Sequence, residues 1–275
     1  MTLTPDFDSF AAGYAAGKNQ IVYTRLAADL DTPVSLMLKL TGAAQNAFVL
    51  ESVTGGEVRG RYSIIGMKPD LIWRCRGTTS AVNRAARYDA DAFEDAAGDP
   101  LDTLRALIAE SRIDLPGDLP QAAAGLFGYL GYDMIRLIEH LPNVNPDPLG
   151  LPDAMMVRPS VIAVLDGVKG EVTIVSPAWV SDGQSAKAAY AQAAERVMDA
   201  VRDLERSMPG ASRDLGEAHE ESSPVSNFTR DEYKSAVEKA REYIVAGDIF
   251  QVVPSQRWAQ GFSQPPFALY RSLRR

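Results

Sequence analysis

The sequence has little of the chemistry on which disulfide-rich, zinc-binding or membrane proteins depend. It contains one cysteine, Cys75, and two histidines in 275 residues. A single cysteine excludes an intrachain disulfide, and without a Cys-x-x-Cys or His-x-x-x-His pair a conventional zinc site has no ligands. No secretory signal is recognisable, and no apolar run approaches the ~18 residues of a membrane-spanning helix. We therefore expect a cytoplasmic protein without membrane contact, because a reducing compartment suits a lone thiol.

Positive charge is also scarce. The chain has 28 Lys and Arg against 36 Asp and Glu, a net charge of −8, and this balance disfavours general nucleic-acid binding, which needs a basic surface. The P-loop pattern is absent, which excludes a phosphate cradle of that kind. Apolar residues make up 46% and charged residues 23% of the chain. These fractions are typical of a soluble globular protein and argue against wholesale disorder.

Strand-like and helical patterns are interspersed over the first 206 residues. Period-two or continuous apolar runs predict strands, and a period near 3.6 predicts helices. An Asp166-Gly167 turn between two of the strand runs predicts a hairpin. We expect strands at 21–26, 62–67, 71–76, 155–165 and 171–175, and helices at 33–40, 100–111 and 186–206.

A change of composition predicts a domain boundary near residue 208. Residues 208–227 hold Pro, Gly, Ser and Glu with hardly any large apolar side chain, which is typical of a linker. Thr229 and Glu232 then form a capping-box pattern at the start of a helix that Gly247 ends, and a strand is expected at 249–258. We expect domains at 1–207 and 228–275, the second incomplete because so short a segment rarely builds its own core.

The residues that could carry catalysis form no convincing group. His140 follows a short helical pattern and reads as a capping or surface residue, and His219 lies in the expected linker. Cys75 lies between Arg74 and Arg76, cations that could lower the pKa of a thiol. On a strand, however, both arginines point away from the cysteine face, so a buried structural cysteine is the favoured interpretation.

A glycine series at 125–131 also invites a functional interpretation. Its spacing, Gly-x-x-Gly-x-x-Gly, differs from the dinucleotide-binding fingerprint. A tight bend between a strand and a helix explains these glycines better. The sequence therefore gives no nucleotide site here.

Two segments could line a binding site. In the first, Glu51 and Ser52 end an apolar strand, and a Gly-Gly turn and two arginines follow. These side chains could receive the amino group and carboxylate of a small zwitterion; the alternative is a strand edge with a surface hairpin. In the second, Gln251, Ser255 and Arg257 would share one face of the strand at 249–258. That face would line a pocket or lie at a sheet edge, where Pro254 is tolerated.

Both segments carry a family resemblance. Leu-Glu-Ser at 50–52, Gly-Gly-Glu at 55–57 and Arg-Gly-Arg-Tyr-Ser-Ile-Ile-Gly at 59–66 resemble the N-terminal signature of anthranilate synthase component I. Gly-Asp-Ile-Phe-Gln-Val-Val-Pro-Ser-Gln-Arg at 247–257 resembles the first strand of that family's chorismate-binding domain. Gly-Leu-Phe-Gly-Tyr at 125–129 and Asp133 lie between them in the expected order. Val49 departs mildly from the pattern, because the family usually has leucine there.

The resemblance implies an activity and its regulation. The family aminates chorismate with ammonia and releases pyruvate, giving anthranilate for tryptophan synthesis. It requires Mg²⁺, takes ammonia from a glutamine amidotransferase subunit, and is inhibited by tryptophan bound between the N-terminal and chorismate-binding parts. Ser52 matches the family's tryptophan-contacting serine, and Glu51 is its neighbour. The implied fold is α+β, with mostly antiparallel sheets layered with helices.

The resemblance also implies that functional residues of the family lie outside these 275 residues. Family members are about twice as long, so we expect the Asn-Pro-Ser-Pro segment that completes the tryptophan pocket to follow Arg275. The catalytic histidine, the metal-binding glutamates and the chorismate contacts are expected there too. No catalytic and no metal-binding residue is therefore assigned in this chain, and we expect the segment to be inactive alone.

Two other functions stay open. An aminodeoxychorismate synthase has the same fold and can bind tryptophan, although the unbroken match over 51–66 favours anthranilate synthase. A stand-alone amino-acid-binding module is the third hypothesis. The capping box and the expected strand after the linker argue against this hypothesis, because they indicate the start of a further domain.

Overall fold

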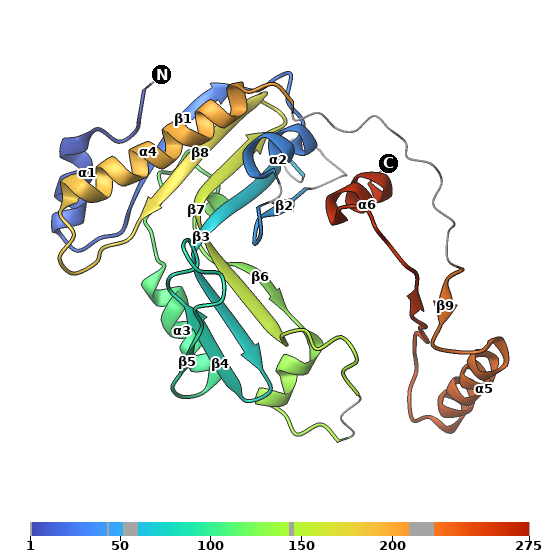
Figure 1. Cartoon of the computed structure of the whole chain (residues 1–275). Coiled ribbons are helices and arrows are strands. Elements are labelled where there is room, and N and C mark those ends of the chain that lie inside the picture. The colour runs from blue at the N-terminus through green and yellow to red at the C-terminus, as the bar shows by residue number, and fades with distance from the viewer. Residues whose placement is uncertain (1, 43, 52–59, 143–145, 209–222, 275) are drawn as a thin grey trace. The chain divides into compact units, whose positions relative to one another are not determined.

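The computed structural model describes residues 2–42, 44–51, 60–142, 146–208 and 223–274. The chain divides into two compact units, Met1–Pro209 and Gly210–Arg275. The first unit contains the antiparallel sheet and the helices that cover it (Figure 1). The expected α+β class with antiparallel strands and layered helices is confirmed.

The helices of the first unit begin where the sequence places capping residues. Thr32 and Ser35 form a reciprocal capping box, and Asp99 and Ser185 cap the next two long helices through their side-chain oxygens. These oxygens accept hydrogen bonds from backbone N–H groups that would otherwise lack partners. The helices are α1 (Phe7–Ala15), α2 (Pro33–Thr41), α3 (Pro100–Glu110) and α4 (Ala186–Glu205), with the 3₁₀ turns η1 (Gln121–Ala123) and η2 (Tyr132–Leu137).

The sheet has the strand order β1-β8-β7-β3-β4-β5, with β2 paired to β3 and β6 paired to β7, and these pairings are antiparallel. The expected hairpin at Asp166 joins β7 to β8. The strands are β1 (Gln20–Ala27), β2 (Phe48–Leu50), β3 (Tyr62–Arg76), β4 (Thr79–Asn83), β5 (Glu94–Ala96), β6 (Phe127–Leu130), β7 (Ala154–Asp166) and β8 (Glu171–Ala178).

The long strands β3 and β7 hold the unit together. We expected two strands at 62–67 and 71–76, but the structure has one strand of 15 residues with an irregularity between Pro69 and Leu71. Pro69 faces Pro159, whereas Leu71 faces Arg158, so Asp70 is an extra residue in β3. A bulge of this kind shifts the side-chain alternation by one position. The bulge therefore interrupts the apolar pattern of the sequence, which predicted two separate strands.

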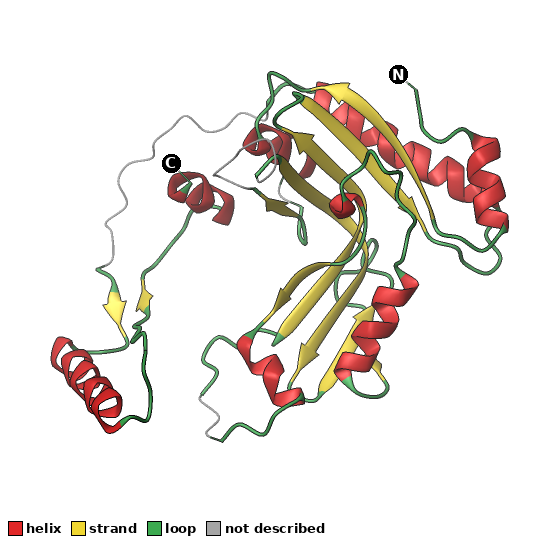
Figure 2. Cartoon of the chain, turned by 180° about the vertical axis from the view of Figure 1, so that it is seen from behind, coloured by secondary structure: helices red, strands yellow, loops and turns green. Residues whose placement is uncertain are grey.

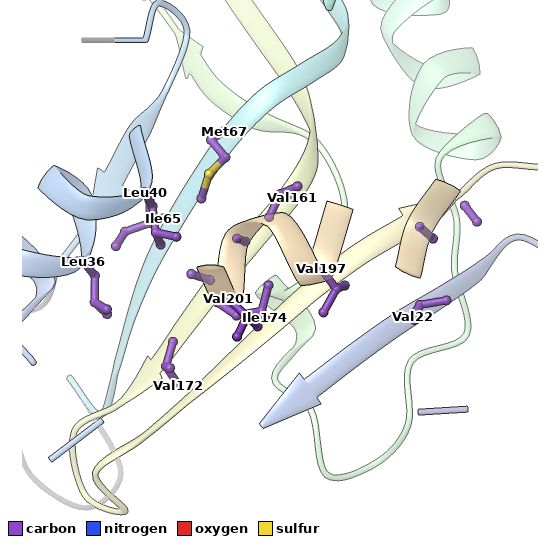
Figure 3. Close-up of a cluster of buried hydrophobic side chains, with 14 of the residues drawn as sticks. Val22, Leu36, Leu40, Ile65, Met67, Val161, Val172, Ile174, Val197 and Val201 are labelled. Atoms are coloured by element: carbon purple, nitrogen blue, oxygen red, sulfur yellow. The ribbon is translucent and has the colours of Figure 1, made fainter. Parts of the chain in front are cut away.

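Helices cover one face of the upper half of the sheet. Figure 1 shows α4 lying across β1 and β8, with α1 and α2 beside it. Alternate residues of each strand point to this layer, because side chains of a strand alternate between faces. Figure 3 shows part of the resulting core, to which α2 contributes Leu36 and Leu40 and α4 contributes Val197 and Val201.

The opposite face is also buried. Ile162 and Val164 of β7 point to that side and pack against Leu119 and Ala123. Figure 2 shows a loop and a short helical turn passing over this face. Burial on both faces explains why these strands read as continuous apolar runs rather than as alternating patterns.

A third apolar cluster fills the lower half of the sheet. Leu71, Trp73 and Cys75 of β3 are fully buried there against Leu104 and Leu107 of α3. The indole Nε1 of Trp73 donates to Thr103 Oγ1 at 3.0 Å, which satisfies its polar atom inside the core.

The second unit contains β9 (Val225–Ser226), α5 (Arg230–Ala246), β10 (Trp258–Ala259) and α6 (Pro266–Leu273). The capping box at Thr229 and Glu232 is confirmed, and Gly247 ends α5 with a φ of 82°. The expected strand at 249–258 is wrong over most of its length, because only Trp258–Ala259 forms a strand among the described residues of this segment. Its partner β9 has two residues, so most of the extended segment has no strand to pair with.

Candidate functional site

The first candidate segment begins at the end of β2. Phe48, Val49 and Leu50 pair with Gly66, Ile65 and Ile64 of β3. Glu51 follows directly and is half-buried. Ser52 lies outside the described residues. Strand alternation places Glu51 on the same side of β2 as Val49, which packs against the core under α2.

Close packing on a glycine fixes β2 in place. A Cβ atom at Gly66 would lie 2.3 Å from the ring of Phe48 and 2.9 Å from Pro159 Cγ, so only glycine leaves room for this ring. The ring of Phe48 also contacts the ring of Phe127, with centroids 4.8 Å apart. The packing of Phe48 therefore fixes the end of β2 and with it the position of Glu51.

An ion pair fixes the other end of the same segment. Arg61 Nε and Nη2 donate to Asp166 Oδ1 and Oδ2 at 2.9 and 2.5 Å. Asp166 Oδ1 also accepts from the backbone N–H groups of Val168 and Lys169, both at 3.1 Å. The bond from Arg61, followed by these N–H groups, lowers the pKa of Asp166. Arg61 thus attaches the start of β3 to the β7–β8 turn.

Residues 52–59 are therefore bounded by two fixed positions. One is the strand end before Glu51, and the other is the ion pair of Arg61. A carboxylate delivered by a fixed strand end can accept hydrogen bonds from an ammonium group.

The second candidate segment does not form the expected face. Gln251, Ser255 and Arg257 are exposed and lie outside any strand, so period-two alternation does not align them. Arg257 instead bonds through its backbone: its N–H donates to Asn227 Oδ1 at 2.7 Å, and its carbonyl accepts from Asn227 N–H at 3.0 Å. In the second unit, these three polar side chains therefore do not form the shared face that the sequence pattern predicted.

The comparison with known proteins decides the family. The sequence matches the family described as chorismate binding enzyme over residues 66–275. The chain belongs to the chorismate-binding enzyme family.

Similar proteins agree with this assignment. The protein named anthranilate synthase component 1 from Cereibacter sphaeroides is 71% identical over 269 residues, covering 98% of this chain and 54% of that relative. The protein of the same name from Thermus thermophilus is 38% identical over 251 residues, covering 90% and 49%. The chain thus spans about half the length of the curated relatives it matches.

A solved structure also matches this member of the chorismate-binding enzyme family. The crystal structure of anthranilate synthase component I from Streptococcus pneumoniae superposes with a TM-score of 0.60 at 26% identity. The match covers 90% of this chain and 51% of that chain. The expected resemblance and fold are confirmed.

The remaining candidates of this chorismate-binding family member have structural explanations. Cys75 is buried, and desolvation raises the pKa of its thiol, so the favoured structural interpretation is confirmed. His140 is exposed. Gly128 lies so close to β7 that a Cβ would meet the carbonyl oxygen of Met155, and η2 follows β6, in agreement with a tight bend. His219 lies outside the described residues.

The Mg²⁺ that the resemblance implies does not fit the described part of the chain. Among those residues, no group of three or more His, Cys, Asp or Glu side chains is placed to hold a metal ion. No helix in the described ranges is long and apolar enough to cross a bilayer.

The sequence patterns missed one polar cluster altogether. Arg158 is buried in the middle of β7 and pairs with Asp70 and Glu110. A charged residue inside an otherwise apolar strand was the available signal, because a buried arginine needs partners. Those partners come from β3 and α3, at positions that no local pattern connects.

Proposed function

We propose that this chain is part of an anthranilate synthase component I. The complete protein would convert chorismate and ammonia to anthranilate and pyruvate in tryptophan biosynthesis. The observation that carries this proposal is the 71% identity over 269 residues with the Cereibacter sphaeroides protein of that name. The described residues offer no assembled catalytic or metal group, so the chemistry would belong to the rest of the protein.

In this proposal the end of β2 contributes to a tryptophan site. The Glu51 carboxylate would accept hydrogen bonds from the ligand ammonium group, and the Ser52 hydroxyl would bind its carboxylate. The support is the fixed position of the strand, with Phe48 packed on Gly66 and Phe127. The inhibitor would act by stabilising an inactive state of the enzyme, since neither side chain takes part in bond breaking.

The proposal includes the partners of the complete protein. A glutamine amidotransferase subunit would supply ammonia, and Mg²⁺ would be held by residues outside the described part of this chain. The word "component" in the names of the relatives supports a second subunit. We place the reaction in the cytoplasm, where the unpaired thiol of Cys75 would stay reduced.

Product analysis of the complete protein tests the function. With chorismate, Mg²⁺ and ammonia, we expect fluorescent anthranilate and pyruvate in equal amounts. Aminodeoxychorismate as the product would support the sister activity and overturn the proposal. Tight binding of an amino acid without any turnover would support a stand-alone binding module instead.

The 275-residue chain is the matched sample for that assay. We expect it to form no anthranilate, with either ammonia or glutamine as the nitrogen source. Magnesium-dependent turnover by the purified chain, free of host enzyme, would contradict the assignment of catalysis to the rest of the protein.

A further inference from the structure

A polar cavity lies in the first unit, away from the β2 strand end. It is half open to solvent and has a volume of about 220 Å³, between the bulge of β3, the middle of β7, the end of β8 and the first turns of α4. Its lining holds three arginines but one carboxylate. The residues that line it are Asp70, Arg84, Arg158, Ala178, Trp179, Ser181, Gln184, Ala189, Gln192 and Arg196.

Two of the arginines pair with carboxylates. Arg158 Nε donates to Asp70 Oδ1 at 2.8 Å, and its Nη1 donates to Glu110 Oε1 at 3.0 Å. Arg84 forms two bonds of 2.8 Å with Glu110. The bulge in β3 makes this possible, because the extra residue is Asp70 itself. Two cations and two anions thus form a balanced framework.

The framework also orders the aromatic wall of the cavity. The guanidinium of Arg158 lies 4.4 Å from the ring centroid of Trp179, a cation–π contact. The backbone N–H of the next residue, Val180, donates to Asn19 Oδ1 at 2.8 Å. Trp179 is therefore held from two sides.

The third arginine is different. Among the ion pairs of the described residues none involves Arg196, and its Nη1 makes one long bond of 3.4 Å to the carbonyl of Pro177. Its Nε is buried without a hydrogen-bond partner, and so is Nε1 of Trp179. Burial lowers the pKa of Arg196, and the positive charge of Arg87 acts in the same direction, whereas the negative charges of Asp70 and Glu195 act against them. The cavity is therefore lined by one arginine without an ion pair among the described residues, and two buried N–H donors beside it lack acceptors.

Buried donors without acceptors are rare and costly in folded proteins. The cavity is also lined by Ser181 and Gln184, which precede α4. Its volume is that of several water molecules, enough for a carboxylate or a phosphate group. We propose that this cavity binds a small oxyanion through Arg196, with the Trp179 ring as part of the wall. A rotamer change of Arg196, which is free of ion pairs among the described residues, brings its donors to the ligand.

The test uses the indole N–H of Trp179 as a probe. In ¹H–¹⁵N spectra of the 275-residue chain, the Trp179 indole signal is assigned from its loss in Trp179→Phe. The chain is titrated at pH 7 with sodium acetate in one arm and sodium phosphate in the other, with sodium chloride holding the ionic strength constant. We expect a saturable shift of this signal. Saturation with acetate identifies a carboxylate ligand, and saturation with phosphate identifies a phosphate.

Variants separate binding from general charge effects. Arg196→Gln should weaken the binding about tenfold or more, because a charge-assisted bond is lost. Arg202→Gln removes an exposed arginine from the same helix and should leave the binding unchanged. If Arg196→Gln does not fold, Arg196→Lys keeps the positive charge but removes the guanidinium donors. It should then reduce the thermal stabilisation that the anion gives.

Three results would overturn the proposal. The first is the absence of a saturable shift with either salt, which would mean that water alone fills the cavity. The second is an equal shift in sodium chloride. The third is binding of the same strength in Arg196→Gln as in Arg202→Gln.

Discussion

Arg61 and Asp166 are 105 positions apart in sequence and form a two-point ion pair that ties the start of β3 to the β7–β8 turn. Their side chains are 26% and 11% exposed, so the pair is partly shielded from water. A partly shielded pair with two bonds in good geometry is stronger than an ordinary surface salt bridge. It has consequences for stability that depend on pH.

Asp166→Asn should lower the free energy of unfolding at pH 7 by about 1–3 kcal/mol, because a charge-assisted interaction is lost. The pKa of Asp166 is lowered in the folded protein, so its contribution is present above the unfolded pKa of about 3.9. That contribution disappears as the pH falls through the lower, folded pKa. Urea unfolding at pH 7 and at acidic pH measures the difference between variant and parent, which should shrink in acid. The exposed Asp182→Asn is the control, and an equal loss in both variants would contradict the role of the pair.

Gly66→Ala should displace Phe48 and loosen β2. The added methyl would lie 2.3 Å from the aromatic ring, and overpacking of this kind costs about 1–3 kcal/mol of unfolding free energy. Gly117→Ala is the control, because a Cβ there meets nothing within 4 Å. When Phe48→Ala is already present, the further cost of Gly66→Ala should fall, which a double-mutant cycle detects. Equal costs in both backgrounds would show that the ring is not the obstacle.

Ser52→Ala in the complete protein should relax inhibition by tryptophan and leave the maximal rate nearly unchanged. The loss of one hydrogen bond to a charged ligand group costs about 0.5–3 kcal/mol, which raises the inhibitory concentration between about twofold and a hundredfold. Glu51→Gln should act in the same direction. Glu195→Gln, on the exposed side of α4, is the control. Unaltered inhibition in Ser52→Ala would remove this residue from the proposed site.

The thiol of Cys75 should react slowly with a disulfide reagent such as DTNB while the chain is folded. The residue is fully buried, and desolvation raises the pKa of the thiol, so little thiolate is available. In urea above the unfolding transition, one thiol per chain should react rapidly. Fast reaction of the native chain would show that the β3–α3 core opens readily.

Much of the fold followed from local patterns. Thr229 and Glu232 predicted the start of α5 because a capping box is complete within four residues. The strand at 155–165 and the hairpin at Asp166 followed from an apolar run and a turn, which are also local. Cys75 was correctly expected in the core because strand alternation turns Arg74 and Arg76 away from it.

The features that the sequence did not predict correctly have one physical cause. Each depends on partners that are distant in the sequence. The segment 249–258 has the composition of a strand, but a strand needs a neighbour along its whole length, and β9 supplies two residues. The cluster around Arg158 likewise joins a bulge, a helix end and a strand centre. The family of the chain was recognised from the residues around Glu51, whereas the position of Ser52 in a tryptophan site stays a prediction.

The shared strands β3 and β7 have a consequence for how the first unit comes apart. Their upper halves lie in the core beneath α2 and α4, and the lower half of β3 forms the wall against α3. Neither core can melt without removing backbone partners from strands that the other core requires. The unit should consequently behave as a single cooperative foldon, in which damage near α3 is felt at the far end beside Glu51.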